Sequence, residues 1–466
     1  MRLAWFTPWP PDRSGIAGRS AELVPVLAAA GHGIDVFVDE RRTGPCPRQP
    51  DAGPAPGAVR VSSAHDFVWR QRRGQYDLAV YQIGNSRLHE FLWPYLFRWP
   101  GLAVFHDARI HHARGRALLA PGRPDAAAYR AEFAWNHPDV PPDAAELAIR
   151  GFDGPYYYQW PMTRAVLAAS RLAVTHSHGA VEALRETAGT AGLDVPVEYV
   201  ALGEGRATPP ADAERRATRE ALGLPPDAVV AGVFGGLTPE KRVELILRAF
   251  AAVASSAPAA HLALVGTPDP RLDLAGAIHA TGLGDRIHVI PPPPDDDAFD
   301  RAIGAVDVSL HLRWPTALET SGPWLRALAA GRATVVVDLA HQTALPTLDP
   351  RTWQPHAPAP PGPAADPVAV AIDILDEAHS LRRALARLVR DAGLRADLGR
   401  AARAYWTREH TLARMADDYA RVLPLAAARP APATPLPPHL TGDPLRHARA
   451  LAAEAGVVLP SEIEIP

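Results

Sequence analysis

Short apolar runs alternate with longer stretches of helical periodicity along most of the chain. RLAWF (2–6), GIDVFV (33–38) and YDLAVYQIG (76–84) are rich in β-branched and aromatic residues, a pattern typical of buried strands. RSAELVPVLAAAG (19–31), between the first two, has the length of a helix and ends in glycine. A strand, a helix and a second strand form a βαβ unit, which predicts a parallel sheet with right-handed crossovers.

The alternation starts again near the middle of the chain. AVVAGVFGG (228–236), HLALVG (261–266) and RIHVIP (286–291) have the same strand character. The chain has 466 residues, which is too long for one hydrophobic core. We therefore predict two α/β domains of similar size with a cleft between them. Residues 368–425, after the second set of strands, are predicted to form two or more amphipathic helices.

The stretch 306–338 combines a strand, a polar loop, a helix and a further strand. Ser321 or Gly322 is the expected N-cap of the helix, and the loop places Glu319 and Thr320 beside it. Free N–H groups and the positive end of the helix dipole favour an anion there, above all a phosphate. Glu319 would then bind hydroxyl groups or stabilise a positive charge, and a sugar-nucleotide site is the first hypothesis.

The composition argues against several classes of protein. A net charge of −3 gives no support to a nucleic-acid partner. Cys46 is the only cysteine, so a disulfide framework is excluded and a reducing, cytoplasmic compartment is expected. No apolar run is long enough to span a bilayer, and LAWF (3–6) is too short for the apolar part of a signal peptide.

Three stretches of the chain carry a resemblance to a known family. They are PWPPDRSGIAGRSAELVPVLAAAGHGIDVFV (8–38), GVFGGLTPEKRVELILRAFAAVASSAPAAHLALVG (232–266) and LRWPTALETSGPWLRALAAGRATVVVD (312–338). Together they resemble the retaining family-4 glycosyltransferases of the GT-B fold. The run LGRAARAYWTREHTLARMADDYARVL (398–423) also looks like the final helices of that family, so the resemblance covers about residues 1–425.

The resemblance implies an α/β protein with two Rossmann-like domains facing each other across a cleft. The second domain would bind a nucleotide-diphosphate sugar, the first would bind the acceptor, and a C-terminal helix would cross back to the first domain. The expected activity is metal-independent transfer, with retention, from a UDP-sugar or GDP-sugar to an acceptor hydroxyl. The expected boundaries are 1–205 for the first domain, 206–226 for a linker, 227–405 for the second domain, 406–425 for the crossing helix and 426–466 for a Pro-rich tail with a short helix.

The resemblance also implies site residues. His106, at the end of the strand LAVFHD (102–107), matches a family histidine that contacts the donor sugar, and Glu319 is expected to hold the same sugar. The structural alternatives are a strand-end histidine without a catalytic role and a carboxylate that merely suits a helix N-terminus. The expected donor-binding residues are Gly15, Gly235, Gly236, Lys241, Arg242, Arg313, Thr320, Ser321 and Gly322.

Two departures from the family pattern affect the donor site. Many members have a second glutamate at the spacing where this chain has Ala327, with Arg326 beside it, and that glutamate usually binds the ribose. Many members also carry an arginine where this chain has Gly236. Arg242 or Arg313 is the candidate for the missing positive charge.

Other chemical signals carry less weight. Asp295–Asp297 resembles a metal-binding acidic run, but it follows four prolines and is expected to cap a helix. The pairs His111–His112 and His176/His178 lack a third ligand, so no metal site is predicted. The aromatic cluster GPYYYQWP (154–161) is a candidate for the wall of a substrate pocket.

Three alternative functions remain open at this stage. A nicotinamide-dependent oxidoreductase would share Rossmann-like halves, but no strand–helix turn carries G-x-G-x-x-G. A non-catalytic GT-B homologue that binds a glycan or nucleotide would explain the missing second glutamate. A sugar-nucleotide epimerase of the same fold would need no acceptor. The acceptor class (glycan, lipid-linked or small molecule) and a peripheral contact with a membrane are also left open.

Overall fold

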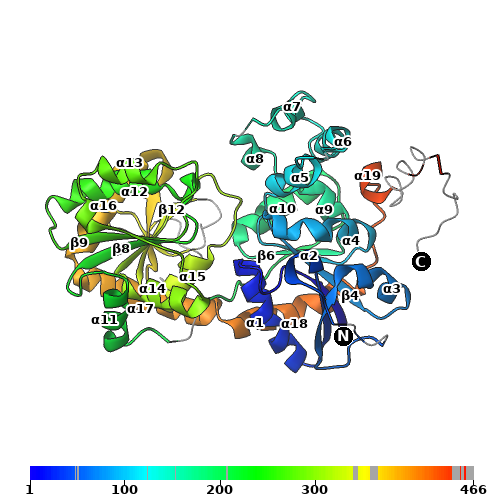
Figure 1. Cartoon of the computed structure of the whole chain (residues 1–466), viewed down its shortest axis with the longest axis horizontal. Helices are drawn as coiled ribbons and strands as arrows, with labels where there is room; N and C mark the ends of the chain where they lie inside the picture. The colour runs from blue at the N-terminus through cyan, green and yellow to red at the C-terminus, as the bar shows by residue number, and fades with distance from the viewer. Residues whose placement is uncertain are drawn as a thin grey trace.

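The chain folds into two α/β domains that lie side by side, joined by helices that pass beneath both (Figure 1). No helix of the described residues has the length and apolar character needed to cross a bilayer. The computed structural model describes residues 1–47, 49, 52–122, 124–152, 154–205, 208–339, 345–356, 366–442, 452, 456 and 457.

The first domain is built on a parallel sheet in the order β3-β2-β1-β4-β5-β6-β7. Nearly every residue of the central strands is buried, because helices cover both faces of the sheet. The strands are β1 (Arg2–Phe6), β2 (Gly33–Val38), β3 (Val59–Ser63), β4 (Leu78–Ile83), β5 (Leu102–Phe105), β6 (Leu172–Thr175) and β7 (Val197–Tyr199). The helices are α1 (Gly15–Ala29), α2 (Glu40–Thr43), α3 (Phe67–Arg72), α4 (Trp93–Arg98), α5 (His111–Leu118), α6 (Ala126–Asn136), α7 (Ala144–Ile149), α8 (Tyr156–Gln159), α9 (Arg164–Ala168) and α10 (His178–Thr190).

The second domain repeats this plan with the order β10-β9-β8-β11-β12-β14-β13. The first strand of each half lies inside its sheet and the strand order reverses beside it, so both sheets have a crevice at their carboxyl ends. The strands are β8 (Val229–Phe234), β9 (Ala260–Val265), β10 (Ile287–Ile290), β11 (Val308–His311), β12 (Ala333–Asp338), β13 (Thr347–Leu348) and β14 (Ala369–Asp373). The helices are α11 (Asp212–Ala221), α12 (Val243–Ala254), α13 (Leu274–His279), α14 (Asp296–Ala305), α15 (Gly322–Ala329), α16 (Glu377–Arg390) and α17 (Ala392–Glu409), followed by α18 (Leu412–Ala428) and α19 (Pro438–Thr441).

Local capping chemistry sets where the helices nearest the cleft begin. The Ser321 hydroxyl accepts a hydrogen bond from the Trp324 amide at 3.3 Å, so Ser321 is the N-cap of α15. The Asp295 carboxylate accepts one from the Ala298 amide at 2.7 Å, which confirms that the acidic run caps a helix. Gly331, with a φ of 65°, then ends the turn after α15 in the left-handed region that favours glycine.

The chain returns to the first domain through α17 and α18 (Figure 1). α17 packs on α15 and β12 of the second domain, whereas α18 packs on α1 and β4 of the first. Tyr419 of α18 is fully buried, with its ring centroid 5.5 Å from that of Trp5 in β1. The predicted fold class is therefore confirmed: two Rossmann-like domains face each other, and a C-terminal helix crosses back.

The structure corrects one prediction about secondary structure. Residues 368–425 were expected to be entirely helical, but they begin with β14, which pairs in parallel with β12 and β13. β14 is buried on both faces, and a buried parallel strand is a short apolar run without alternation, which periodicity cannot separate from a helix. The Pro/Ala loop between 357 and 365 and most of the tail after Gly442 lie outside the described residues.

The docking of α18 should contribute strongly to stability. We expect Tyr419→Ala to lower the free energy of unfolding by about 3–5 kcal/mol, because it removes a fully buried aromatic ring from between two elements. Leu425→Ala, on the same helix but 48% exposed, is the matched control and should cost less than about 0.5 kcal/mol. Urea unfolding followed by circular dichroism measures both, and equal effects would contradict the docking role.

Candidate functional site

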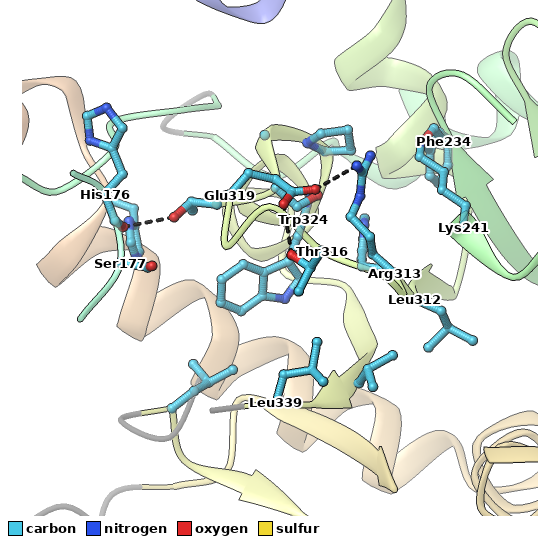
Figure 2. A pocket seen from close by; sticks show the side chains of 18 of the residues that line it. His176, Ser177, Phe234, Lys241, Leu312, Arg313, Thr316, Glu319, Trp324 and Leu339 are labelled. Atoms are coloured by element: carbon cyan, nitrogen blue, oxygen red, sulfur yellow. Dashed lines mark hydrogen bonds and ion pairs between the residues drawn. The ribbon is translucent and has the colours of Figure 1, made fainter. Parts of the chain in front are cut away.

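A cavity of about 250 Å³ lies between the two domains (Figure 2). Its walls come from the carboxyl ends of β6, β8, β11 and β12, so the crevices of both sheets open into it. The first domain contributes residues such as His176, Ser177 and Tyr199, and the second contributes Lys241, Arg313, Glu319 and the start of α15. We call this space the interdomain cavity.

The loop between β11 and α15 attaches the second domain to the first at one side of this cavity. Four hydrogen bonds connect the loop to the ends of β5 and β6, and the backbone carbonyls of the loop accept three of them. They are Ala108 N–H to Ala317 O (2.8 Å), Arg109 Nη1 to Thr316 O (2.9 Å), Ser177 Oγ to Leu318 O (3.3 Å) and Thr320 Oγ1 to His176 O (2.8 Å). The position of Glu319 is therefore set by both domains together.

The Glu319 carboxylate is held in place by two hydrogen bonds and one ion pair. Its Oε2 accepts hydrogen bonds from the Thr316 hydroxyl and from the Ala317 amide, both at 2.8 Å. Its Oε1 lies 2.6 Å from Arg313 Nη1, and Figure 2 shows the carboxylate between Arg313 and Thr316. Because the side chain is only 14% exposed, the carboxylate presents one fixed orientation to a ligand.

Lys241 provides an amine on the opposite side of the cavity. It ends the short 3-10 helix η3 (Pro239–Lys241), and its Nζ donates to the carbonyl oxygen of Phe234. Gly235 has a φ of 85°, and a Cβ at that position would lie 2.9 Å from the amine. The backbone conformation favours glycine there, and a side chain at that position would also displace the lysine amine.

Two further properties make this amine distinctive. Lys241 is the only lysine in the 466-residue sequence. All the other Lys/Arg positions are arginine. Burial and the neighbouring Arg313 lower its pKa to about 7, against a smaller opposite effect of Glu319. An arginine could not change its charge near neutral pH, so the site holds a compact cation that can lose its proton.

The N-terminus of α15 points its first turn at the same cavity. Ser321, Gly322 and Trp324 all line the cavity, and the Trp324 indole is fixed by donating to Thr334 Oγ1 at 3.3 Å. The helix dipole adds partial positive charge to that of Lys241 and Arg313. Lys241, Arg313, Glu319, Thr320, Ser321 and Gly322 are thus the sequence-predicted residues that the structure brings together.

Other predicted residues lie elsewhere. Arg242, with a φ of 58°, forms an ion pair with Glu377 of α16 and is not part of the cavity wall. Gly15 begins α1 with open space around its Cβ position, and Gly236 follows Gly235 in the loop after β8. Neither glycine lines the interdomain cavity, so these three positions have no contact there that would support a donor-binding role.

His106 lies at the end of β5, directly before Asp107, and is not among the residues that line the interdomain cavity. Its Nε2 is 2.7 Å from Gln82 Oε1, and the Gln82 amide donates to the Tyr419 hydroxyl at 3.4 Å. That amide orientation makes His106 Nε2 the protonated nitrogen and Nδ1 the acceptor. Burial and the nearby His176 ring hold the pKa of His106 well below its ordinary value, so the imidazole is neutral.

Asp107 follows His106 directly, and its pKa is raised where that of His106 is lowered. Burial and the neighbouring Glu319 raise the pKa of this carboxyl to about 7, although it accepts a hydrogen bond from the Asn85 amide at 2.8 Å. A carboxyl and an amine whose pKa values are both shifted to about 7, on either side of the loop that carries Glu319, are typical of a functional site.

The sequence did not reveal Glu204, which connects several elements behind the cavity. Its carboxylate accepts from Arg19 Nε of α1 at 3.1 Å and from Arg326 Nε of α15 at 2.6 Å. Arg326 also pairs with Asp300 of α14, while Ala327 is fully buried in the core of the second domain. The position where the family usually has a second carboxylate is therefore packed in the core, and the arginine beside it binds a glutamate from the other domain.

Several cavity residues were also missed or set aside as metal candidates. His176 and His178 follow β6, and His178 stacks on Tyr199 with centroids 4.2 Å apart. Their position after a predicted parallel strand was the available signal, because ligands bind at the carboxyl ends of such strands. Within the part of the chain that the structure describes, no group of three or more His, Cys, Asp or Glu residues is arranged to hold a metal ion.

Comparison with known proteins defines the class of fold. No family model matches the sequence, and a search of curated proteins found no match. Sucrose-phosphate synthase from Thermosynechococcus elongatus aligns with a TM-score of 0.60 at 16% identity, over 91% of this chain and 98% of its own. HepE from Anabaena, in complex with UDP and glucose, aligns with a TM-score of 0.55 at 15% identity, over 91% and 100%.

WaaG, a glycosyltransferase involved in lipopolysaccharide biosynthesis, aligns with a TM-score of 0.56 at 15% identity, over 90% of this chain and 99% of its own. At 90–91% of this chain, each of the three alignments includes both domains. The chain therefore has the two-domain GT-B fold that these glycosyltransferase structures share. At these identities the likeness establishes the fold alone.

Removal of the Glu204 carboxylate should destabilise the protein strongly. We expect Glu204→Ala to cost about 3–5 kcal/mol, because Arg19 and Arg326 would stay buried without their shared partner. Glu22→Ala is the matched control: Glu22 also pairs with Arg19 but is 48% exposed, so its loss should cost less than about 1 kcal/mol. Thermal and urea unfolding measure the difference, and equal losses would contradict a central role for Glu204.

Proposed function

We propose that the protein is a glycosyltransferase that moves a sugar from a nucleotide-diphosphate sugar to an acceptor hydroxyl. The observation that carries this proposal is the interdomain cavity, in which Lys241, Arg313 and the N-terminus of α15 surround the carboxylate of Glu319. Cations and free N–H groups suit a diphosphate, whereas a carboxylate among them suits sugar hydroxyls. The GT-B fold of the aligned glycosyltransferases supports the same activity.

The donor would lie with its apolar parts against the second domain. Leu312, Trp324 and Leu339 line the cavity and offer an apolar surface to a nucleoside. The diphosphate would lie between Lys241 and the first turn of α15, which places the sugar beside Glu319. HepE has been solved with UDP and with UDP-glucose, so a UDP-sugar is the first donor we propose and a GDP-sugar the second.

The same groups suit transfer with retention and without a metal ion. The bond between the anomeric carbon and the diphosphate breaks, and its electron pair goes to the diphosphate. The acceptor oxygen bonds to that carbon on the same face, and its proton passes to the released diphosphate oxygen. Lys241, Arg313 and the α15 dipole would stabilise the leaving diphosphate. The unprotonated Nδ1 of His106 would accept a hydrogen bond from a sugar hydroxyl, which is the catalytic role we propose for this residue.

Substitutions in the cavity should reduce turnover without unfolding the protein. With a panel of UDP-sugars and GDP-sugars as donors, we expect Glu319→Gln and Lys241→Met each to lower the rate of nucleotide release about 100-fold or more. Glu244→Gln, an exposed glutamate of α12, is the control and should leave the rate unchanged. A folded wild-type protein that binds nucleotide but releases none from any donor would favour the non-catalytic alternative, and product without an acceptor would favour an epimerase.

The single lysine allows a direct test of the phosphate site. Because the pKa of Lys241 is lowered to about 7, its neutral amine is present above that pH and should react with an acylating reagent with a midpoint near pH 7. Bound UDP would favour the charged amine, raise its pKa and suppress the reaction. Peptide mass spectrometry measures the modification, and the N-terminal amine serves as the internal control. Equal labelling of Lys241 with and without saturating UDP would contradict the assignment.

A further inference from the structure

A second cavity, of about 580 Å³, opens beside the interdomain cavity. Arg313 lines both spaces, and the loop that carries Glu319 borders both, with Thr316 and Glu319 in the wall of the first and Ala317 in the wall of the second. We call this second space the aromatic cleft. Its characteristic residues are Asn85, Asp107, His112, Tyr157, Tyr158 and Arg271.

One wall of the aromatic cleft consists of stacked rings from α5 and α8. The His112 ring stacks on Tyr157 with centroids 4.5 Å apart and planes 20° apart, and it meets Tyr158 edge-on at 5.1 Å. Gly115 lies beneath Tyr157, where a Cβ would be 3.4 Å from the ring. In Figure 1, α8 lies on the side of the first domain that faces the second domain. The rings are thus fixed from behind, since Tyr157 also stacks on Tyr156 at 4.4 Å, and the steeply inclined ring of Tyr158 completes an angled apolar wall against which the C–H face of a sugar ring can pack.

The floor of the cleft is polar, and hydrogen bonds hold its side chains in place. The Asn85 side chain donates to Arg109 O at 2.6 Å and accepts from the Ala113 amide at 3.3 Å, so its orientation is set. Its backbone amide donates to Asp107, which holds that carboxyl at the inner end of the cleft. The pKa of Asp107 is raised to about 7 by burial and by Glu319, so the carboxyl can exchange a proton with a ligand hydroxyl near neutral pH.

Most charged groups of the cleft have a charged partner within the protein. Arg116, on the wall from the first domain, instead donates to the Asn85 carbonyl oxygen at 2.7 Å. Arg313 pairs with Glu319 at 2.6 Å, and Arg271 pairs with Asp269 at 3.0 Å and with Glu240 at 3.3 Å. These guanidinium groups are already committed to carboxylates, so the wall from the second domain offers little positive charge to an anionic ligand. A phosphate in the cleft would face Asp107, Asp269 and Glu240, which line the same space.

We propose that the aromatic cleft binds the acceptor of the transfer reaction, and that this acceptor is a neutral saccharide or similar polyol rather than a sugar phosphate. The inference rests on the proposed function, since it assigns the acceptor side of the same reaction. A sugar ring packed against the aromatic wall that Tyr157 and Tyr158 form would direct a hydroxyl toward Asp107 and the neighbouring donor sugar. Asp107 is then an acceptor-binding residue, and the two tyrosines determine the class of acceptor.

Saturation-transfer difference NMR with UDP-saturated protein tests this assignment. The probes are glucose, galactose, mannose and maltose, each compared with a phosphorylated counterpart such as glucose 6-phosphate. We expect at least one neutral sugar to bind, and Tyr157→Ala and Tyr158→Ala each to weaken its binding about tenfold through loss of a stacking ring. UDP affinity should stay within about twofold in these variants, because neither tyrosine lines the interdomain cavity.

Control variants separate the outcomes of this experiment. Trp69→Ala, an exposed aromatic residue of α3, should leave sugar binding unchanged, and Tyr158→Phe should retain it if stacking is the cause. Tighter binding of the sugar phosphates, absence of binding by every neutral sugar, or equal loss of UDP affinity in Tyr158→Ala would each overturn the proposal. Failure of the wild-type protein to bind UDP would instead overturn the proposed function, so the two failures are distinguishable.

Discussion

The arrangement of the two domains depends on one buried carboxylate. Glu204 follows β7, where the chain leaves the first domain, and it binds Arg19 of α1 and Arg326 of α15. Its backbone also accepts from the Trp406 indole at 2.6 Å and donates to His410 O at 3.2 Å. Because a buried charge without partners is very costly, these elements are constrained to meet at this point. The cleft on the other side of the junction takes its shape from that constraint.

Two adjacent spaces result from this arrangement, and one loop borders both of them. The loop before α15 hydrogen-bonds to the ends of β5 and β6, which brings Glu319 within electrostatic reach of Asp107. Lys241 faces the interdomain cavity, whereas Tyr157 and Tyr158 face the aromatic cleft. A donor group and an acceptor group placed in these spaces would meet at the loop. This proximity supplies the orientation that a transfer reaction between two bound substrates requires.

The residues that the sequence placed correctly in the cavity are those defined by local backbone chemistry. Ser321 caps α15, and Glu319 precedes it. Lys241 ends η3, in the loop after β8 that begins with the left-handed Gly235. Arg242 was expected beside them because it is adjacent in sequence, but its left-handed backbone turns the side chain toward Glu377. Adjacent residues in a tight turn point in different directions, and sequence spacing alone does not show which of them faces the ligand.

The sequence by itself determined most of the strands and helices, although not β14. It also determined the two-domain α/β fold, the caps near the cleft and the presence of one lysine among many arginines, because these follow from neighbouring residues and composition. The tertiary structure decided which distant side chains meet. Glu204 lies 185 residues from Arg19 and 122 from Arg326, and no local pattern encodes such pairs. It also decided the pKa values of Asp107 and Lys241, since burial and the charges of the opposite domain exist only once the domains have come together.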